Sequence, residues 1–508
     1  MKPRAISILT ALSLTLFSAY GNPDDLGGNT TGTVQQQGGV TFTASGGWLE
    51  AGFAEWQPLA NASGYAVYRK LASEADSAYV KVDTELVRGT RMDIPGLLGN
   101  QSYDIKVVPI VGGSEAAGQS SVARIKSQAH DRSGFAFDKR SPRGALGTSG
   151  GYNPDGTVNP AATILYISDA TKDNVQMVVT KGAKTATYTG LVAIQKARST
   201  ARSSAPLIVR FIGTVRPPAA LATDRLKMIS LKDSGNVTYE GIGPDAQLDG
   251  WGMDFQRCNN MEVRNLSFKD QPEDQISFQS NCLNLWIHNN DHFLGKGLPG
   301  TDADKIHGDG PLDVKSGCSW VSVAFNHYHG TDKSNGVGFG KDTDALVMTY
   351  HHNFYDGCGS RMPRISFVSM HVYNTYFKEA RVYTIAAAHG CSAFIENNYF
   401  EKCHRPMIIA SQGHDLNGGR STLSHNDGGT IKLQGNFMDE FTADPVRFDP
   451  AVDASPGPAV KGGALYNNFQ TKFASDYPYI LDSPEDAKAK VLRFAGRMKS
   501  PPRLRHDE

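Results

Sequence analysis

The sequence has no surplus of charge of either sign. Lys plus Arg and Asp plus Glu each number 51, so the formal net charge at pH 7 is zero. A chain without an overall field does not attract a polyanion or a membrane surface through its net charge. Nucleic acid is therefore not an expected partner, and recognition of an anionic ligand has to rest on a local group of cations.

Long hydrophobic runs are absent after the N-terminal segment. The one long apolar run, Ile6 to Phe17, follows two early cations and is followed by the small residues Ala19 and Gly21. That arrangement is typical of a secretory signal peptide, here residues 1–21, and the run is too short to span a bilayer. We expect a secreted protein, extracellular or periplasmic, without a membrane span.

Cysteine is scarce, and no Cys-x-x-Cys pair is present, which disfavours zinc. In a compartment that permits disulfides, two alternatives stay open: buried single thiols in a repetitive core, or one or two disulfides. The six cysteines are Cys258, Cys282, Cys318, Cys358, Cys391 and Cys403.

The N-terminal part of the chain differs in composition from the rest. Residues 22–39 are rich in Gly, Thr, Gln and Asn and predict a linker. Residues 40–128 place aromatic or branched side chains at every second position, as in SYDIKVVPI, and predict a small antiparallel β-sandwich. This segment resembles a fibronectin type III module, for which a spacer role is favoured over sugar binding. The expected core residues are Trp56, Tyr65, Val67, Tyr68, Tyr103, Ile105 and Val107.

Residues 135–508 contain an internal repeat in which an asparagine is closely followed by an aromatic residue. The repeat recurs at intervals of 21 to 38 residues, a constant unit with insertions of variable length. Each unit starts with a short alternating β run, such as MEVRNL, and then turns where asparagine tolerates a left-handed backbone. The repeated asparagines are Asn265, Asn290, Asn326, Asn353, Asn374, Asn398, Asn436 and Asn468.

Strands this short bury their inward face only when they stack rung on rung, which predicts a solenoid. The intervals suit three short strands with their turns, so a parallel β-helix fits better than a leucine-rich horseshoe. Cys258 and Cys282 are one rung apart and are expected to stack in the interior. The C-terminal stretch SPEDAKAKVLRFAGRMKS predicts a short amphipathic helix with a serine cap.

The densest unexplained charge lies in the middle of the solenoid. Asp309 and Asp313 flank a tight Gly-Pro turn, and Asp274 precedes them by about one long rung. Taken singly each Asp fits a turn, but three stacked carboxylates repel unless a cation lies between them, and Ca²⁺ with oxygen ligands meets that need. A carboxylate-rich partner would occupy the cations of the same region, which are Lys315, Lys333, Arg361 and Arg364.

Over roughly residues 200–470 these segments resemble the extracellular pectate lyases of the right-handed parallel β-helix type. The family's motifs occur in the family's order as DQISF, DGPLDVK, HGTDK, TYHHNFY, RMPR and HVYNTYF. The resemblance implies an all-β fold, a right-handed parallel β-helix preceded by the antiparallel sandwich. It further implies that the Ca²⁺ ligands are Asp274, Asp309 and Asp313, that Lys315 and Lys333 bind substrate carboxylates with Arg364 beside them, and that Arg361 is the base.

Two positions depart from the family pattern. Family members carry a further substrate-binding arginine five residues after the catalytic one, where this chain has Ser366. The family's WIDH segment is replaced by Trp286-Ile287-His288-Asn289. The contacts that the family makes at these positions must be made otherwise here.

The reaction that the resemblance implies is calcium-dependent β-elimination in α-1,4-polygalacturonate, giving 4,5-unsaturated oligogalacturonides. Positive charge held against the substrate carboxylate stabilises the negative charge that builds there as the C5 proton leaves. Because an arginine keeps its proton until strongly alkaline pH, we expect an alkaline optimum. The expected partner is pectin or polygalacturonate, and the protein is expected to be a monomer.

Three alternatives stay open. A calcium-independent pectin lyase shares the fold but should lack the three-Asp group. A polygalacturonase-type hydrolase needs paired carboxylates for an acid and an attacking water, a mechanism that has no use for Lys315 and an arginine base. A non-catalytic pectin-binding β-helix protein is favoured by Ser366 and disfavoured by the retention of Arg361 with Lys333.

Overall fold

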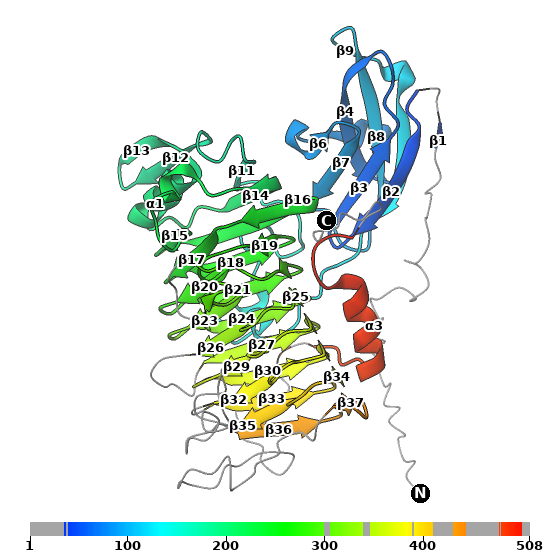
Figure 1. Cartoon of the computed structure of the whole chain (residues 1–508). Helices are drawn as coiled ribbons and strands as arrows, with labels where there is room; N and C mark the ends of the chain where they lie inside the picture. The colour runs from blue at the N-terminus through cyan, green and yellow to red at the C-terminus, as the bar shows by residue number, and fades with distance from the viewer. Residues whose placement is uncertain are drawn as a thin grey trace, which may run out of the picture.

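The chain forms a small sandwich followed by a long stack of parallel strands (Figure 1). The computed structural model describes residues 35–36, 39–298, 305–338, 346–388, 391–409, 430–442, 477 and 479–499. The signal peptide predicted for residues 1–21 lies outside them, as does most of the predicted linker. The linker's Gln35–Gln36 form strand β1, which pairs with the sandwich. Among the described residues, no helix has the length and apolar character needed to cross a bilayer.

Two antiparallel sheets make up the N-terminal sandwich, as the alternating pattern predicts. Trp56, Val67 and Ile105 are buried between them. The prediction that Tyr68 lies in the core is wrong. Side chains alternate along a strand, so Val67 points inward and the Tyr68 hydroxyl donates to Glu115 on the outer face. One sheet contains β1, β10 (Ser121–Lys126), β8 (Ser102–Val111), β4 (Ala62–Leu71), β5 (Val80–Lys81) and β9 (Ser114–Glu115), and the other contains β2 (Phe42–Trp48), β3 (Ala51–Trp56), β7 (Arg91–Pro95) and β6 (Val87–Arg88).

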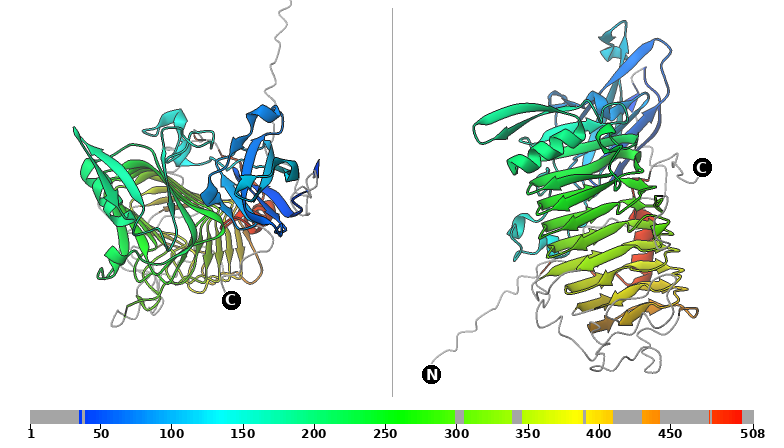
Figure 2. Two further views of the ribbon diagram at one scale, coloured as in Figure 1. Left: turned by 90° about the horizontal axis from the view of Figure 1, so that it is seen from above. Right: turned by 60° about the vertical axis from the view of Figure 1, so that its left-hand side comes forward.

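The predicted solenoid is confirmed as a parallel β-helix, whose stacked rungs are seen side-on and end-on in Figure 2. Its larger sheet bends at one turn per rung and so forms two faces. The strands of this sheet are β11 (Thr163–Ile167), β14 (Leu207–Val215), β16 (Gly235–Asp249), β18 (Asn259–Arg264), β19 (Ser267–Lys269), β21 (Leu283–His288), β22 (Asp291–His292), β24 (Ser319–Ala324), β25 (His327–His329), β27 (Val347–His351), β28 (Phe354–Asp356), β30 (Ser369–Tyr373), β31 (Tyr376–Lys378), β33 (Ser392–Glu396), β34 (Tyr399–Glu401), β36 (Thr430–Gln434) and β37 (Phe437–Met438).

The smaller parallel sheet supplies the third face, and the charged residues that the sequence singled out lie in its strands or just before them. Its strands are β15 (Met228–Lys232), β17 (Gly252–Gln256), β20 (Ile276–Gln279), β23 (Leu312–Lys315), β26 (Asn335–Gly338), β29 (Arg364–Ile365), β32 (Ile385–Ala387) and β35 (Met407–Ile409). Three strands per rung are what the repeat intervals predict.

Stacked side chains fill the interior. Tyr328, Tyr355 and Phe377 lie over one another with ring centroids 4.5 and 5.2 Å apart and nearly parallel planes. All six cysteines are free and buried, so the single-thiol alternative holds. Cys258 and Cys282 stack as predicted, with the backbone N–H of Cys258 donating to Sγ of Cys282 at 3.2 Å.

The repeated asparagines hold the bend of the larger sheet, but they form two neighbouring columns. In the inner column, the backbone N–H of Asn290 donates to Oδ1 of Asn326, and that of Asn326 donates to Oδ1 of Asn353, each at 3.1 Å. Asn265 and Asn374 lie one position earlier in their rungs, with left-handed φ values of 52° and 48°. We predicted a left-handed turn at every repeated asparagine. The left-handed residue is instead the one immediately before the ladder residue of each rung. The inner column continues through Asn398 and Asn436, and Asn468 lies outside the described residues.

Smaller elements close the ends and sides of the solenoid. Helix α1 (Leu191–Ala201) and the hairpin of β12 (Gln176–Lys181) and β13 (Lys184–Thr189) lie at the end near β15 (Figure 2). Helix α3 (Pro484–Phe494) is the predicted C-terminal helix, with the Ser483 hydroxyl accepting from the N–H of Asp486. Short 3-10 turns are η2 (Asp76–Ala78), η3 (Thr84–Leu86), η4 (Ala117–Gln119), η5 (Phe135–Phe137), η6 (Gly144–Leu146) and η7 (Ala219–Leu221).

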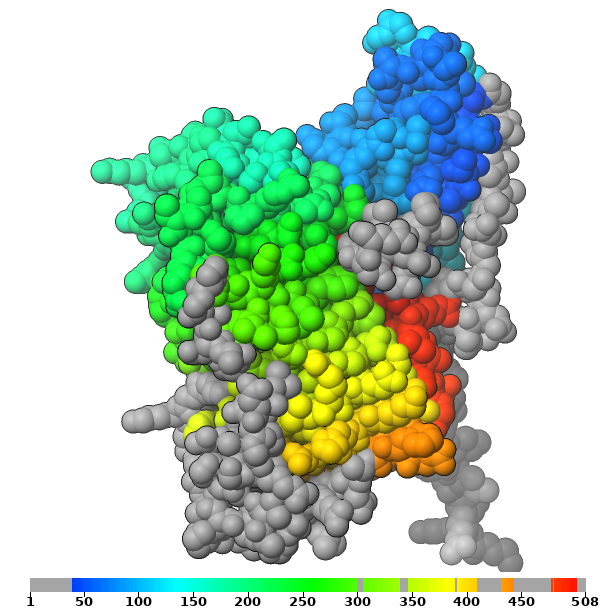
Figure 3. All heavy atoms as spheres, viewed as in Figure 1, coloured from blue at the N-terminus to red at the C-terminus, as the bar shows by residue number. Residues whose placement is uncertain are grey.

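The sandwich rests against the first rungs of the solenoid, and the surfaces of the two meet in Figure 3. Arg88 of β6 forms a 2.7 Å ion pair with Asp245 of β16. Ile242 of β16 is fully buried within the hydrophobic cluster of the sandwich. The sandwich is thus packed onto the solenoid through both polar and apolar contacts.

Candidate active site

The candidate site lies on the smaller sheet, where Asp274 and Asp313 occupy adjacent rungs. Asp274 lies just before β20 and Asp313 lies in β23, and both side chains are largely buried. Nζ of Lys315 lies between them, 2.6 Å from Oδ2 of Asp313 and 3.3 Å from Oδ2 of Asp274. Backbone N–H groups of Gly310 and Gly336 donate to the other oxygens of Asp274 and Asp313, at 3.3 and 2.9 Å.

Lys315 is the cation that lies between the carboxylates of Asp274 and Asp313. Burial raises the pKa of Asp274, and the neighbouring charges of Asp313 and Asp309 add to the rise; against the opposing effect of Lys315, the result is a pKa of about 8. Burial works against the charged form of Lys315, but Asp313 and Asp274 raise its pKa above the ordinary lysine value. Once Asp274 gives up its proton, one lysine faces two buried carboxylates, and the net negative charge favours an added cation.

Asp309 lies on the turn before β23 and is paired with two lysines. Its carboxylate is 2.7 Å from Nζ of Lys305 and 3.3 Å from Nζ of Lys333. Lys305 also lies 3.0 Å from Glu273. Burial alone would raise the pKa of Asp309, but Lys305 and Lys333 lower it to about 2. Asp309 is therefore ionised at any working pH.

Asp274 and Asp313 offer oxygen donors that suit Ca²⁺, with open space between them. A Cβ added to Gly310 would lie 3.5 Å from Oδ1 of Asp313 and 3.8 Å from Oδ1 of Asp274, so this glycine leaves the space open. Carboxylate oxygens are the donors that Ca²⁺ prefers. In the structure the lysines occupy the positions beside these oxygens.

Arg361 lies one rung beyond Lys333. A backbone bridge pairs Lys333 with Ser360, and the carbonyl of Arg361 accepts from the N–H of Asn335 at 2.6 Å. Arg361 itself has a left-handed φ of 59°, which a non-glycine residue adopts only where surrounding contacts hold it. The Arg361 guanidinium lies near the fully buried Tyr383, where burial raises the pKa of the hydroxyl and the charge of Arg361 opposes that rise.

Arg364 shares a column of the smaller sheet with Asp313. The register runs from Asp313 to Gly336 and from Gly336 to Arg364, which places Asp313 and Arg364 about 10 Å apart along the axis. Gly336 offers no side chain, so the column is open between the carboxylate and the guanidinium. Burial lowers the pKa of Arg364, and the neighbouring charge of Arg361 lowers it further.

All seven predicted site residues thus lie on adjoining rungs; five of them form two direct groups, and Arg361 and Arg364 lie one rung beyond Lys333. Lys315 connects Asp274 with Asp313, and Asp309 connects to Lys333. Sequence reasoning missed Lys305 and Tyr383. Lys305 stands in the segment before β23, which has no repeating pattern, and Tyr383 follows Arg361 by one rung, a spacing that the repeat could have indicated.

The two departures from the family pattern have a structural consequence. Ser366 is buried, and its carbonyl would lie 1.6 Å from a Cβ on Gly338, so the backbone of one rung presses on the next. His288 stacks on Trp286 with centroids 3.8 Å apart, and Nδ2 of Asn289 donates to the carbonyl of Phe494. Of these residues, Asn289 helps to dock the C-terminal segment.

Comparison with known proteins places most of the solenoid in one family. The sequence profile of the family described as pectate lyase matches residues 166–434, more than half of the 508-residue chain. A pectate trisaccharide-lyase of Bacillus licheniformis is 29% identical over 233 residues, 45% of this chain and 65% of that protein. Pectate lyase B of Dickeya chrysanthemi is 27% identical over 264 residues, 50% of this chain and 66% of that protein. The chain thus spans about 65% of the length of these relatives.

Among solved structures, the pectate lyase Bsp165PelA from Bacillus sp. N165 in complex with trigalacturonate matches with 21% identity and a TM-score of 0.49. That match covers 72% of this chain and 98% of the other. On the extent of the profile match, the chain belongs to the pectate lyase family.

Proposed function

We propose that this protein cleaves polygalacturonate by calcium-dependent β-elimination. The observation that carries the proposal is the concentration of three carboxylates, Asp274, Asp309 and Asp313, and of four cations on adjoining rungs of the smaller sheet. A polyuronate presents one carboxylate per sugar, so a row of cations along the solenoid suits its spacing.

The metal would be held by Asp274, Asp309 and Asp313. When bound, Ca²⁺ supplies positive charge against the uronate carboxylate and so acidifies the neighbouring C5–H bond. Lys315 and Lys333 then exchange their contacts with Asp313 and Asp309 for substrate carboxylates. The carboxylate–lysine pairs of the structure keep these cations in place until substrate arrives.

In the elimination, Arg361 takes the C5 proton. The electron pair of the C5–H bond forms the C4–C5 double bond, and O4 leaves with the electron pair of its bond to C4, so no water is consumed. The buried Tyr383 lies beside the Arg361 guanidinium and limits its orientations. Arg364, two rungs beyond Asp313, binds the carboxylate of an adjoining sugar.

Substitution of Arg361 separates an enzyme from a binder. Arg361→Ala should lower turnover of polygalacturonate by about a hundredfold or more, the usual effect of removing a general base, while polysaccharide binding is retained. Arg381→Ala is the matched control, because Arg381 is half exposed and pairs with Asp332. Unchanged turnover in Arg361→Ala would overturn the catalytic assignment, and wild-type binding without turnover would favour a non-catalytic pectin-binding protein.

The finer features belong to the same proposal. We infer secretion from the leader at residues 1–21, a fibronectin type III-like spacer role for residues 40–128, a solenoid domain at residues 135–508, and a monomeric state. N-terminal sequencing of the protein recovered from the medium tests the first, and light scattering tests the last.

A further inference from the structure

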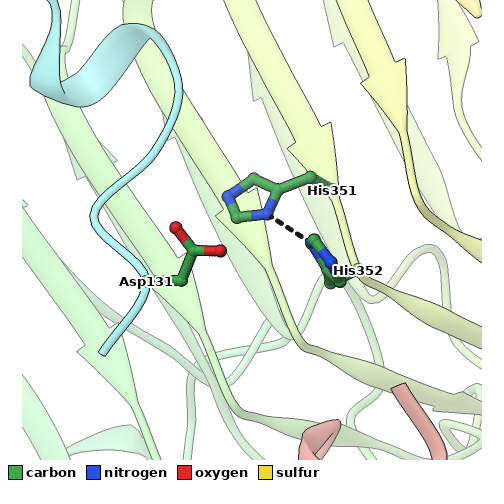
Figure 4. A group of neighbouring side chains, drawn as sticks. All are labelled: Asp131, His351 and His352. Atoms are coloured by element: carbon green, nitrogen blue, oxygen red, sulfur yellow. Dashed lines mark hydrogen bonds between the residues drawn. The ribbon is translucent and has the colours of Figure 1, made fainter. Parts of the chain in front are cut away.

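Away from the candidate active site, a carboxylate and two imidazoles meet where the segment after the sandwich crosses the larger sheet. Asp131 belongs to that segment, His351 ends β27 and His352 follows it. Figure 4 shows the Asp131 carboxylate beside the ring of His351, with His352 on the other side of that ring. One potential ligand atom from each residue lies within 4.8 Å of the other two. Both histidines are fully buried.

The hydrogen bonds of His352 fix its proton. Nε2 of His352 lies 2.8 Å from Oδ2 of Asp482, a carboxylate that also contacts Nζ of Lys490. An ionised carboxylate only accepts, so His352 carries its proton on Nε2 and a lone pair on Nδ1. That Nδ1 lies 3.0 Å from Nδ1 of His351. The two facing nitrogens therefore share one proton or one cation.

His351 and Asp131 also have electron pairs that a cation could use. Nε2 of His351 is buried without a hydrogen-bond partner among the described residues. Burial lowers the pKa of His351 to about 3 and also lowers that of His352, so both rings are neutral and each keeps a lone pair. The Asp131 carboxylate accepts from the Ser133 hydroxyl, while the nearby Lys490 is held by Asp482.

We propose that Asp131, His351 and His352 bind a transition-metal ion of the Zn²⁺ class, which fastens the segment after the sandwich to the solenoid. Two imidazole nitrogens and one carboxylate are a donor set that Zn²⁺ takes with a fourth position open, whereas Ca²⁺ prefers oxygen donors alone. Asp482 supports the site from behind, because a carboxylate on the far nitrogen of a metal-binding histidine fixes its orientation.

Binding has a defined proton balance. The ion takes one nitrogen from each ring, and the proton of His351 moves from Nδ1 to the unpartnered Nε2, so both rings stay neutral and no proton is released. Asp131 exchanges the Ser133 hydroxyl for the ion. Ser133→Ala should therefore bind the ion at least as tightly as the wild type.

A second group of one aspartate and two histidines serves as the internal control. Asp291, His327 and His329 also approach one another, but Asp291 already accepts from His329 and from Nε of Arg497, both at 2.9 Å. An ion there would have to compete with the Arg497 guanidinium. We therefore expect His329→Gln to leave metal binding unchanged.

The test is titration of the untagged full chain with Co²⁺ and with Zn²⁺, in an excess of Ca²⁺ that occupies the three-Asp site. We expect one tight site per chain, a visible Co²⁺ absorption band typical of nitrogen ligands, and a rise in Tm with Zn²⁺. Asp131→Asn and His351→Gln should each weaken binding at least tenfold and abolish the rise in Tm. His329→Gln and Ser133→Ala should keep both.

Three results would overturn the proposal. One is the absence of stoichiometric binding by the wild type at micromolar metal. Another is binding that is lost in His329→Gln and kept in Asp131→Asn. A third is binding that disappears with Ca²⁺, which would place the ion at the three-Asp site. Because the wild-type titration decides by itself, a variant that fails to fold does not leave the question open.

Discussion

Lysines act as internal counterions of the candidate active site. Lys315 lies between Asp274 and Asp313, and Lys305 lies between Glu273 and Asp309. A cation that enters the carboxylate group has to displace these ammonium groups or share their oxygens. At the scale of single residues, the affinity for Ca²⁺ is therefore set by competition with the chain's own lysines.

Removal of Lys305 should strengthen calcium binding. Lys305→Ala leaves Asp309 with one lysine and Glu273 without its ion pair, so we expect the dissociation constant for Ca²⁺ to fall about two- to fivefold, as for the loss of one partly exposed ion pair. Isothermal titration with Ca²⁺ measures this. Lys296→Ala, which removes an exposed lysine of the same loop, is the control and should change nothing. Weaker binding in Lys305→Ala would contradict the competition.

Calcium binding should also depend on pH through Asp274. Its pKa of about 8 means that the calcium-free folded protein holds a proton there that the unfolded chain releases near pH 4. Stability conferred by that proton is lost as the pH rises from about 4 to about 8, and Ca²⁺ affinity rises over the upper part of the same range because the proton competes.

Calcium isotherms at several pH values test this. Affinity should weaken by up to about tenfold for each pH unit below about 8 and level off above it. Asp274→Asn should bind Ca²⁺ poorly at every pH, and in chelator its Tm should gain on the wild type as the pH rises. A pH-independent wild-type affinity would count against the raised pKa.

Sequence alone could predict which residues gather at the site but not their pairing. The charged residues followed from motifs and from rung spacing, and they lie on adjoining rungs. Lys305 lies in a loop of no regular pattern. Tyr383 lies one rung after Arg361, but an uncharged side chain does not stand out among the other aromatic residues of the rungs. The direct pairing of Lys315 with Asp274 depends on side-chain positions across two rungs, which no local pattern records.

At the scale of strands and turns, close backbone contacts between rungs position the site. Gly338 ends β26 beside Lys315 in register, has a φ of 93°, and lies so near Ser366 that a Cβ would be 1.6 Å from its carbonyl oxygen. Only glycine fits this position. A side chain here would push β26 and β29 apart and so move Lys315 and Arg364.

Gly338→Ala should therefore cost about 3 kcal/mol or more in unfolding free energy, from the overpacked contact and the left-handed backbone together. Turnover should fall with it. Gly330→Ala is the matched control, since Gly330 also has a positive φ of 61° but nothing lies within 4 Å of its added Cβ. We expect it to cost about 1–2 kcal/mol. Equal losses in the two variants, measured by chemical denaturation, would argue against the contact.

At this scale, the sequence predicted the structure correctly where a single repeat interval decides which side chains face inward. Alternation gave the sandwich core and the asparagine repeat gave the rungs. The same pattern misplaced Tyr68, because Val67 and Tyr68 are consecutive and only one of them faces inward. It also merged Asn265 and Asn374 with the ladder asparagines, because the left-handed position and the ladder position are adjacent in every rung.

At the scale of the whole molecule, the sandwich and the solenoid share a buried boundary. Arg88 bridges Asp93 of the sandwich and Asp245 of the solenoid at 3.0 and 2.7 Å, and Ile242 joins the hydrophobic cluster of the sandwich. Sequence composition located both parts but gave no sign of this contact, because the residues that meet are far apart in the chain.

We therefore expect the two parts to unfold together. Calorimetry of the full chain should show one transition, and Arg88→Ala should lower stability by about 1–3 kcal/mol because it leaves buried Asp93 short of a partner. Lys81→Ala, which removes an exposed ion pair with Glu115, should stay within about 0.5 kcal/mol of the wild type. Two well-separated transitions would show that the boundary does not couple the parts.

The central claim is that the three-Asp group and Arg361 together form a calcium-dependent lyase site. Its most direct test is the ultraviolet absorbance of unsaturated products formed from polygalacturonate at alkaline pH, with Ca²⁺ and then with excess chelator. The account predicts absorbance that rises with Ca²⁺, stops on chelation and returns when Ca²⁺ is restored. Absorbance that is indifferent to chelator would contradict the role of the three carboxylates, and no absorbance on any polyuronate would contradict the lyase itself.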